Sequence, residues 1–181
     1  MNYIFLTGGT SKRFGSNKSA AILNGKSLLE YATDGLNNLI VVGPTSNVNA
    51  IYVREVPEFS GPVAAISAGL QEVKSEVVGI FAIDMPFAPR IVSDLERALI
   101  HDASLPIDKY GFVQPLAGIY RTTSLRRALL EFESTQNQSM KSLISKLIID
   151  EVPLVETELL MDIDTPEDYL VAIDLASRLV Q

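Results

Sequence analysis

Glycines and cationic side chains gather in one short stretch of the sequence, residues 6–18. Gly8 and Gly9 follow the apolar run at residues 3–6, and basic side chains come soon after them, Lys12, Arg13 and Lys18. Glycine accepts positive φ angles and lets backbone N–H groups approach a ligand closely, and successive N–H groups form a concavity for anions. In a chain with a net charge of −7, this positive loop predicts a binding site for a polyphosphate.

Two common glycine-rich phosphate loops do not match this stretch. The Walker A motif has four residues between its glycines and then Gly-Lys-Ser/Thr. Here five residues separate Gly9 from Gly15, and Lys18 does not follow a glycine. The dinucleotide fingerprint G-x-G-x-x-G is also absent. A hydride-transferring dinucleotide enzyme is therefore excluded, while a strand followed by an ordinary basic surface loop stays open.

Asp84 is the first candidate for a metal-binding carboxylate. It follows the most hydrophobic run of the chain, residues 77–83, and precedes Met85-Pro86. A carboxylate at the end of a buried strand is partly desolvated and needs a cation nearby. An aspartate before a proline turn is also a common cap, so the local sequence leaves both roles open. The phosphate loop at residues 6–18 favours the metal.

A second pair of carboxylates, Asp162 and Asp164, precedes the string Thr165-Pro166-Glu167-Asp168. On an extended segment the two side chains point to the same side, so both or only one could face a metal. Thr165 can cap a helix whose first residue is Pro166, and capping is the alternative role for Asp164. The segment thus offers either a second metal ligand or a helix cap.

Residues 6–18 resemble the signature L-x-G-G-x-S-x-R-x-G-x-x-K of the molybdenum cofactor guanylyltransferase family of MobA-like NTP transferases. The matching residues are Leu6, Gly8, Gly9, Ser11, Arg13, Gly15 and Lys18. Residues 83–86 resemble the family's D-M-P motif. Residues 61–70 and 114–121 resemble its G-P-L-A-G-I-x-x-G-L and H/Q-P-L-x-x-x-Y-R segments. The resemblance covers nearly the whole chain.

Several positions bear on the base that such a protein would read. Residues 161–168 are similar to the family motif N/D-x-N/D-T-P-E-D. Guanylyltransferases usually carry Asn at both variable positions, and D-x-D, as in Asp162 and Asp164, is commoner in cytidylyl relatives. Gly8-Gly9 instead matches the guanylyl members, and Thr7 stands where Ala is usual. The resemblance implies GTP as the donor and leaves a cytidylyl relative as the alternative.

The resemblance implies that GMP passes from GTP to the terminal phosphate of molybdopterin and that pyrophosphate leaves. Mg²⁺ would be held by Asp84 and Asp164, and the catalytic residues would be Arg13, Lys18 and Asp84. The acceptor phosphate carries the attacking oxygen, so the protein needs no nucleophile of its own. Whether a molybdenum cofactor carrier protein makes transient contact to deliver the acceptor stays open.

The resemblance also implies the residues that contact the nucleotide. They are Leu6, Thr7, Gly8, Gly9, Thr10, Ser11, Lys18, Asn47, Glu55 and Asp84. Asn47, or alternatively Asn49, would read the base together with Glu55, and ordinary solvated loop residues are the alternative for all three. A further group could either contact the acceptor or simply be exposed: Lys109, Tyr110, Gln114 and Arg121.

Two other functions share these features. An NTP transferase acting on another acceptor, such as a sugar phosphate, would carry every motif named above. A noncatalytic nucleotide-binding module is expected to lose an acid or the loop lysine, but Asp84, Asp164, Arg13 and Lys18 are all present.

The elements that must position these residues alternate between strands and helices. Apolar runs predict strands at residues 3–6, 39–42, 51–54, 77–83 and 148–155. Helical periodicity and capping signals predict helices at residues 26–32, 63–73, 89–100, 124–132, 139–147 and from 165 onward. A strand interrupted by Pro115 is expected within residues 111–121, and residues 160–163 are expected to be extended.

This alternation predicts a three-layer α/β/α sandwich with a Rossmann-like, mostly parallel sheet. The resemblance implies the GT-A-like nucleotidyltransferase type of this fold. Nothing in the sequence resembles an interdomain linker, so we expect one domain over residues 1–181. Ligands of such sheets bind beyond the carboxyl ends of the strands, where the stretch at 6–18 and Asp84 are both expected.

Composition excludes several other classes. The chain has 181 residues, of which 47% are hydrophobic, and it has no cysteine and one histidine, so disulfide scaffolds, thiolate metal sites and histidine clusters are excluded. A net charge of −7 argues against nonspecific binding to nucleic acid or acidic membranes. The sequence shows no signal-peptide or transmembrane pattern, and we expect a cytoplasmic protein.

Overall fold

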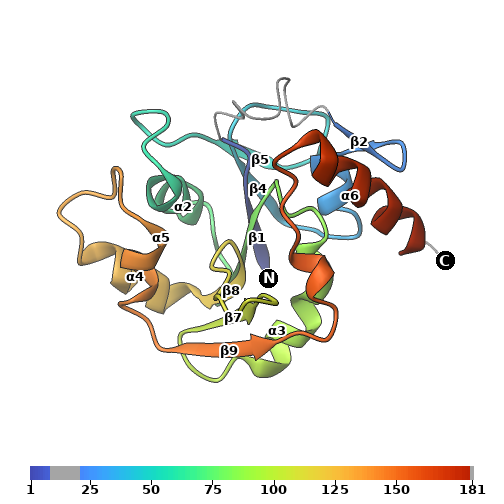
Figure 1. Cartoon of the computed structure of the whole chain (residues 1–181). Coiled ribbons are helices and arrows are strands. Elements are labelled where there is room, and N and C mark those ends of the chain that lie inside the picture. Colours follow the sequence, from blue (N-terminus) through green and yellow to red (C-terminus); the bar gives the residue numbers. More distant parts are fainter. Residues whose placement is uncertain (9–20, 180–181) are drawn as a thin grey trace.

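The computed structural model describes residues 1–8 and 21–179, which form a seven-stranded sheet with helices on both faces (Figure 1). In spatial order its strands are β5 (Ile51–Val53), β4 (Leu39–Val42), β1 (Asn2–Leu6), β6 (Val77–Ala82), β8 (Ala117–Arg121), β7 (Ala103–Ile107) and β9 (Ile149–Pro153). A separate hairpin is formed by β2 (Ile22–Leu23) and β3 (Lys26–Ser27).

The α-helices of the described residues are α1 (Leu28–Ala32), α2 (Pro62–Leu70), α3 (Val92–Ala98), α4 (Thr122–Leu130), α5 (Met140–Ile144) and α6 (Pro166–Arg178). Short 3₁₀ turns are formed by η2 (Ala88–Ile91) and η3 (Thr157–Leu160). Within residues 1–8 and 21–179, no helix has both the length and the apolar character required to cross a membrane.

β8 runs against the other strands. β4 and β6 pair in parallel with β1, β5 pairs in parallel with β4, and β9 pairs in parallel with β7. β8 is antiparallel to both β6 and β7. The predicted mostly parallel sheet is therefore confirmed. Because β8 is reversed, its first residue, Ala117, pairs with Phe81 near the carboxyl end of β6.

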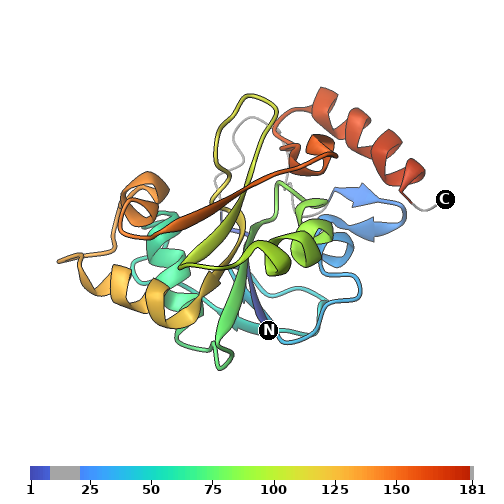
Figure 2. The same ribbon diagram turned by 90° about the horizontal axis from the view of Figure 1, so that it is seen from below.

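Alternate residues of the central strands face two separate apolar layers. Phe5 and Phe81 stack with ring centroids 5.7 Å apart, in a cluster that includes buried residues of α1, α3 and α6. Ile4 and Ile80 face the opposite cluster, which includes buried residues of α2, α4 and α5. Figure 2 shows the sheet between these two groups of helices. The predicted three-layer sandwich is confirmed, and the side chains of each strand alternate between the layers.

The sequence prediction was wrong or incomplete in several elements. β7 was not predicted, and the strand expected within residues 111–121 begins only at Ala117. The helix expected at residues 89–100 starts as the 3₁₀ turn η2 and becomes α-helical at Val92. Residue 160, expected to be extended, ends the 3₁₀ turn η3.

Candidate active site

The carboxyl ends of β1, β4 and β6 meet at one sheet edge, which we call the carboxyl edge. The Thr7 N–H donates to the carbonyl oxygen of Val42 at 3.1 Å, and the Ile83 N–H donates to that of Leu6 at 3.1 Å. The Ala82 N–H donates to the carbonyl oxygen of Leu116 at 2.9 Å. The carboxyl edge therefore joins the residue before the glycines, the residue before Asp84 and the segment that precedes β8.

Asp84 lies at the carboxyl edge, two residues after the end of β6 at Ala82. It is half-buried between Ile83 and Met85, which are both buried. The Met85 N–H donates to the carbonyl oxygen of Ala82 at 3.2 Å, so the chain turns immediately after the strand. The carbonyl oxygen of Asp84 accepts a hydrogen bond from the Ile163 N–H at 2.9 Å. This bond brings the D-M-P turn next to the segment that carries Asp162 and Asp164.

Asp162 and Asp164 flank Ile163, which faces the protein core. Ile163 is fully buried, whereas both aspartates are exposed. Both carboxylates therefore belong to the exposed side of a segment whose backbone is bonded to Asp84. This arrangement agrees with the prediction that they point to the same side, and it brings the two acidic motifs together.

The helix cap after this segment belongs to Thr165. Its hydroxyl oxygen accepts from the Asp168 N–H at 3.1 Å, and the Asp168 carboxylate accepts from the Thr165 N–H at 2.8 Å. Pro166 occupies the first turn of α6. The predicted cap is confirmed for Thr165, and the carboxylate of the reciprocal pair is that of Asp168 rather than Asp164.

Part of the predicted phosphate loop lies outside the described residues. This applies to Gly9, Thr10, Ser11, Arg13 and Lys18, whereas Leu6, Thr7 and Gly8 are described. The described chain resumes at Ala21, and the hairpin that follows is attached to α6. The Tyr169 hydroxyl donates to the carbonyl oxygen of Ile22 at 2.6 Å and accepts from the Ile22 N–H at 3.1 Å.

Thr7 packs against Gly43, which follows β4. The Thr7 hydroxyl lies 3.3 Å from the carbonyl oxygen of Val42, to which it donates. A Cβ atom on Gly43 would lie 2.0 Å from Thr7 Oγ1 and 3.5 Å from the backbone nitrogen of Gly8. Residue 43 therefore must lack a side chain for Thr7 to take this position. The sequence alone gave no reason for Thr7, and the signal for Gly43 was only its place after an apolar strand.

The residues predicted to read the base lie in different places. Glu55 follows β5 at the carboxyl edge, and its carboxylate accepts from the Phe59 N–H at 3.0 Å. Asn47 is exposed in the connection between β4 and β5. Asn49, the alternative, lines a hollow of about 440 Å³ together with Asn38 and Leu39 at the amino end of β4. Asn49 is therefore wrong for a site at the carboxyl edge.

The residues predicted to contact the acceptor lie at different edges of the sheet. Gln114 precedes β8 and lies toward the carboxyl edge, where its amide donates to the Asp108 carboxylate at 2.8 Å. Arg121 ends β8 beside Val77, the first residue of β6, and therefore lies at the opposite edge. Its guanidinium donates to the carbonyl oxygens of His101 at 2.6 Å and Ile100 at 3.2 Å. Arg121 supports the fold at that edge and is wrong as an acceptor contact.

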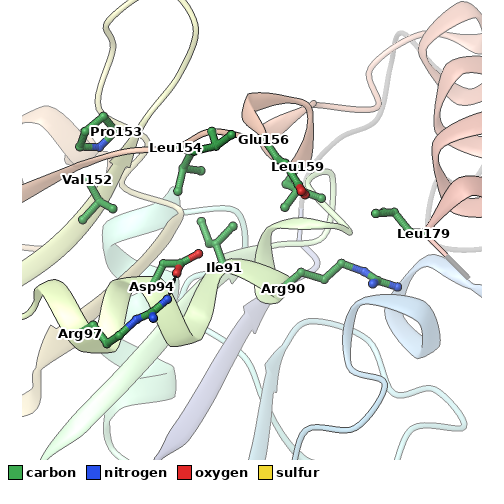
Figure 3. Close-up of a pocket in the computed structure, with 11 residues that line it drawn as sticks. Arg90, Ile91, Asp94, Arg97, Val152, Pro153, Leu154, Glu156, Leu159 and Leu179 are labelled. Carbon is green, nitrogen blue, oxygen red and sulfur yellow. Dashed lines mark hydrogen bonds and ion pairs between the residues drawn. The ribbon is translucent and has the colours of Figure 1, made fainter. Parts of the chain in front are cut away.

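A hollow of about 550 Å³ lies between α3 and the chain that follows β9 (Figure 3). Arg97 pairs with Asp94 on its rim. Arg90 points toward Leu179, and its guanidinium lies 5.9 Å from the centre of the Tyr31 ring. The residues that line this hollow include none of the predicted site residues, so it is separate from the candidate active site.

The acidic residues at the carboxyl edge suit a magnesium ion. The described part of the chain contains no group of three or more His, Cys, Asp or Glu residues arranged to hold a metal by themselves. Mg²⁺ is commonly bound by only one or two carboxylates, with phosphate oxygens and water completing the octahedron. Asp84 and the neighbouring segment at residues 162–164 provide hard oxygen ligands of this kind, so the residues present fit the ion.

Comparisons with known proteins identify the family of this chain. Residues 3–152 match the family described as the MobA-like NTP transferase domain. A Nostoc sp. protein named "Probable molybdenum cofactor guanylyltransferase" is 30% identical over 187 residues, covering 93% of this chain and 88% of the relative. The Polynucleobacter asymbioticus protein named "Molybdenum cofactor guanylyltransferase" is 25% identical, covering 91% of this chain and 92% of the relative.

Solved structures share the fold. The crystal structure of molybdopterin-guanine dinucleotide biosynthesis protein A from Archaeoglobus fulgidus has a TM-score of 0.72 at 24% identity, covering 98% of this chain and 100% of the other. A nucleotidyl transferase from Methanothermobacter has a TM-score of 0.76 at 16% identity, with 98% of each chain covered. The family match and the 30% identical relative together show that this chain belongs to the MobA-like NTP transferases and is a nucleotidyltransferase.

Proposed function

We propose that this nucleotidyltransferase moves GMP from GTP to the terminal phosphate of molybdopterin and releases pyrophosphate. The observation that carries the proposal is the hydrogen bond between the Asp84 carbonyl oxygen and the Ile163 N–H, 2.9 Å long. It brings the two acidic family motifs together at the edge where the chain enters the glycine-rich stretch. The donor and the acceptor are those implied by the names of the relatives.

The chemistry requires placement and neutralisation of charge. A phosphate oxygen of the acceptor attacks the α-phosphorus of GTP, and the bond from that phosphorus to the bridging oxygen breaks, so pyrophosphate leaves with the electron pair. No residue of the protein forms a covalent bond. Alignment of the reacting oxygens and stabilisation of the developing charge dominate such transfers.

The residues of the proposed site divide these tasks. Backbone N–H groups from Gly8 to Ser11, with Arg13, hold the β- and γ-phosphates, and Lys18 reaches the α-phosphate. Asp84 and Asp164 hold Mg²⁺, which when bound neutralises charge on the phosphate oxygens. Glu55 and Asn47 contact the base. The position of Glu55 at the carboxyl edge supports its part in this assignment.

CTP is the second candidate for the donor. The observation in its favour is that residues 162 and 164 are both Asp, the pair that is commoner in cytidylyl relatives. Gly8-Gly9 favours GTP. The two donors differ only in the base, so a direct comparison with one acceptor distinguishes them.

The test is incubation with molybdopterin, Mg²⁺ and each labelled NTP in turn, followed by separation of a dinucleotide product. We expect product with GTP and little with CTP, ATP or UTP. Thermal unfolding with each NTP gives an independent measure, since a ligand at about 100 times its dissociation constant stabilises by about 2.7 kcal/mol. Selective stabilisation by CTP would overturn the assignment of GTP, and no product with any NTP would overturn molybdopterin as the acceptor.

A further inference from the structure

The loop between β7 and β8 exposes two aromatic rings. Tyr110 is 73% exposed and Phe112 is 67% exposed. The ammonium group of Lys109 lies 5.0 Å from the centre of the Tyr110 ring. Exposed aromatic side chains grouped with a cation on one short loop offer ring faces for stacking and a positive charge for an anionic group.

Hydrogen bonds to one carboxylate hold this loop in a fixed shape. Asp108 Oδ1 accepts from the N–H groups of Tyr110 at 2.8 Å and Phe112 at 2.9 Å, and Oδ2 accepts from the Gln114 side-chain amide at 2.8 Å. The Asp108 N–H donates to the carbonyl oxygen of Phe112 at 2.9 Å. Gly111, with a φ of 84°, completes the turn. A loop fixed before binding loses little conformational entropy when a ligand docks on it.

The loop lies at the carboxyl edge, beside the proposed reaction site. The Leu116 carbonyl oxygen, just before β8, accepts from the Ala82 N–H, two residues before Asp84. Figure 2 shows the loop projecting beyond the strands on the same side as the start of α6. In the sheet order β1-β6-β8-β7, β6, which leads to Asp84, lies between the end of β1 at Leu6 and the strands that this loop joins.

This order suits a transfer with two substrates. The attacking and leaving oxygens lie roughly in line on opposite sides of the phosphorus. With the triphosphate on the β1 side, the acceptor approaches from the β8 and β7 side, where the two rings project. A pterin offers a flat ring face for stacking and an attached anionic phosphate, which suits the nearby charge of Lys109.

We propose that Tyr110 and Phe112 form a stacking platform for the flat heterocyclic ring of the acceptor, with Asp108 as the positioning residue that holds the backbone N–H groups of both. The inference rests on the proposed function, because it names the part of the chain that binds the second substrate of the same reaction. It adds Phe112 and Asp108, which the sequence did not indicate, and it gives Gln114 a supporting role in the loop.

The test compares the double variant Tyr110→Ala/Phe112→Ala with the intact protein. We expect the KM for molybdopterin to rise on the order of 10- to 100-fold, since stacking on one aromatic ring typically contributes about a factor of ten or more. The KM for GTP and the kcat at saturating acceptor should stay close to their original values. Ring-retaining Tyr110→Phe should keep the original KM, whereas Tyr110→Leu/Phe112→Leu, which keeps apolar bulk, should resemble the alanine variant.

A matched control removes a similar exposed apolar surface at the opposite edge of the sheet. Ile100 and Ile148 are 72% and 62% exposed, and they precede β7 and β9. The variant Ile100→Ala/Ile148→Ala should leave the acceptor KM unchanged. Thermal unfolding of each variant measures folding, and sedimentation velocity measures the oligomeric state.

The outcomes separate this inference from the proposed function. If the intact protein makes the dinucleotide and the alanine variant has an unchanged acceptor KM, the platform is wrong while the function stands. If the variant instead dissociates an oligomer at unchanged acceptor KM, the rings serve contact between copies and the inference is overturned. If the intact protein forms no product from GTP and molybdopterin, the proposed function itself fails, and the inference falls with it.

Discussion

The backbone carbonyl oxygen of Asp84 and the backbone nitrogen of Ile163 are 2.9 Å apart and joined by a hydrogen bond. Side-chain changes at Asp84, Asp162 or Asp164 leave this bond in place, because both of its atoms belong to the backbone. The acidic residues around it can therefore be substituted without separating the two segments. This property makes the roles of the individual carboxylates testable one at a time.

Replacement of Asp84 by Ala should abolish most turnover while the fold survives. The change removes a ligand of the proposed Mg²⁺ site, and losses of on the order of 100-fold or more in kcat are typical when a group that stabilises the transition state is removed. Steady-state kinetics measures the loss, and far-UV circular dichroism checks the fold. Asp174, 73% exposed on α6, provides the control Asp174→Ala, which should keep full activity. Near-normal turnover of the Asp84 variant would contradict its assignment.

Asp164 and Asp162 should differ in their effect on magnesium dependence. If Asp164 holds the ion, Asp164→Ala should raise the Mg²⁺ concentration for half-maximal activity on the order of tenfold, because one anionic oxygen ligand is lost. Asp162→Ala should raise it less. Activity measured against Mg²⁺ concentration at fixed GTP gives both values. A larger shift for Asp162 would transfer the ligand role to that residue.

Gly43→Ala should destabilise the protein through its contact with Thr7. The added Cβ would lie 2.0 Å from Thr7 Oγ1, and overpacking of this kind typically costs about 1–3 kcal/mol. Urea unfolding measures the change. In the double variant Thr7→Ala/Gly43→Ala the colliding hydroxyl is gone, so part of the lost stability should return. If the loss of stability in the double variant equals the sum of the losses in the two single variants, the Thr7 hydroxyl is not the obstacle.

The fixed shape of the loop between β7 and β8 should depend on the ionised form of Asp108. The N–H groups of Phe112 and Tyr110, with the Gln114 amide, lower the pKa of Asp108 below its ordinary value of 3.8. The pKa of Asp108 is lower in the folded protein than in the unfolded chain. The stabilisation of the loop by the ionised carboxylate is therefore complete above pH 3.8 and is lost as the pH falls through the folded pKa. The protection of the Tyr110 and Phe112 amides, measured as the exchange rate relative to the intrinsic rate at each pH, should therefore be constant at about pH 5 and above and should fall in acid.

The variant Asp108→Ala distinguishes the contribution of an ordered loop to acceptor binding from the contribution of the two aromatic rings. This variant keeps both rings but removes their shared acceptor, so exchange at the two amides should accelerate and the KM for the acceptor should rise. Asp108→Asn keeps one carbonyl oxygen for the two N–H groups and should recover part of the effect. Unchanged exchange in the alanine variant would show that the loop is held by its other contacts.

The sequence predicted the elements whose residues are uniformly apolar, and it failed where a strand breaks that pattern. β4 (Leu39–Val42) has the predicted bounds because all four of its residues are buried and hydrophobic. β7 (Ala103–Ile107) contains Ser104 and Pro106, which argue against a central strand. Its position is fixed by pairing with β8 and β9, which are distant in sequence. No local pattern contains that information.

The candidate site shows the same division between local and distant signals. The Thr165 cap was recognisable from neighbouring residues alone, whereas the residues around Asp84 left a cap and a metal ligand open. The function of Gly43 depends on Thr7, and that of Asp108 depends on the N–H groups that turn back toward its carboxylate. The sequence left Arg121 as either an acceptor contact or an exposed residue, and the second alternative holds. The choice depends on the reversed direction of β8, which only the sheet topology reveals.

Asp102 should contribute to stability at the edge opposite the active site. Its side chain is only 15% exposed, and it accepts from the Ile148 N–H at 2.9 Å and the Ser124 hydroxyl at 2.5 Å. The Ile148 N–H, then the Ser124 hydroxyl, lower the pKa of Asp102 below 3.8. The stabilisation is therefore complete above 3.8 and is lost as the pH falls through the folded pKa.

Asp102→Ala should lower the free energy of unfolding by about 2 kcal/mol near neutral pH, because it leaves the buried Ser124 hydroxyl and the Ile148 N–H without their acceptor. Asp34→Ala is the matched control, since Asp34 pairs with Lys26 at 2.7 Å but is 67% exposed. Exposed pairs of this kind contribute at most about 1 kcal/mol. Urea unfolding of both variants at neutral pH and below pH 3.8 measures the difference. The difference in lost stability between the two variants should become smaller in acid, because protonation removes the charge of Asp102 that its hydrogen-bond donors stabilise. Equal losses in the two variants at neutral pH would show that burial of the Asp102 carboxylate adds nothing.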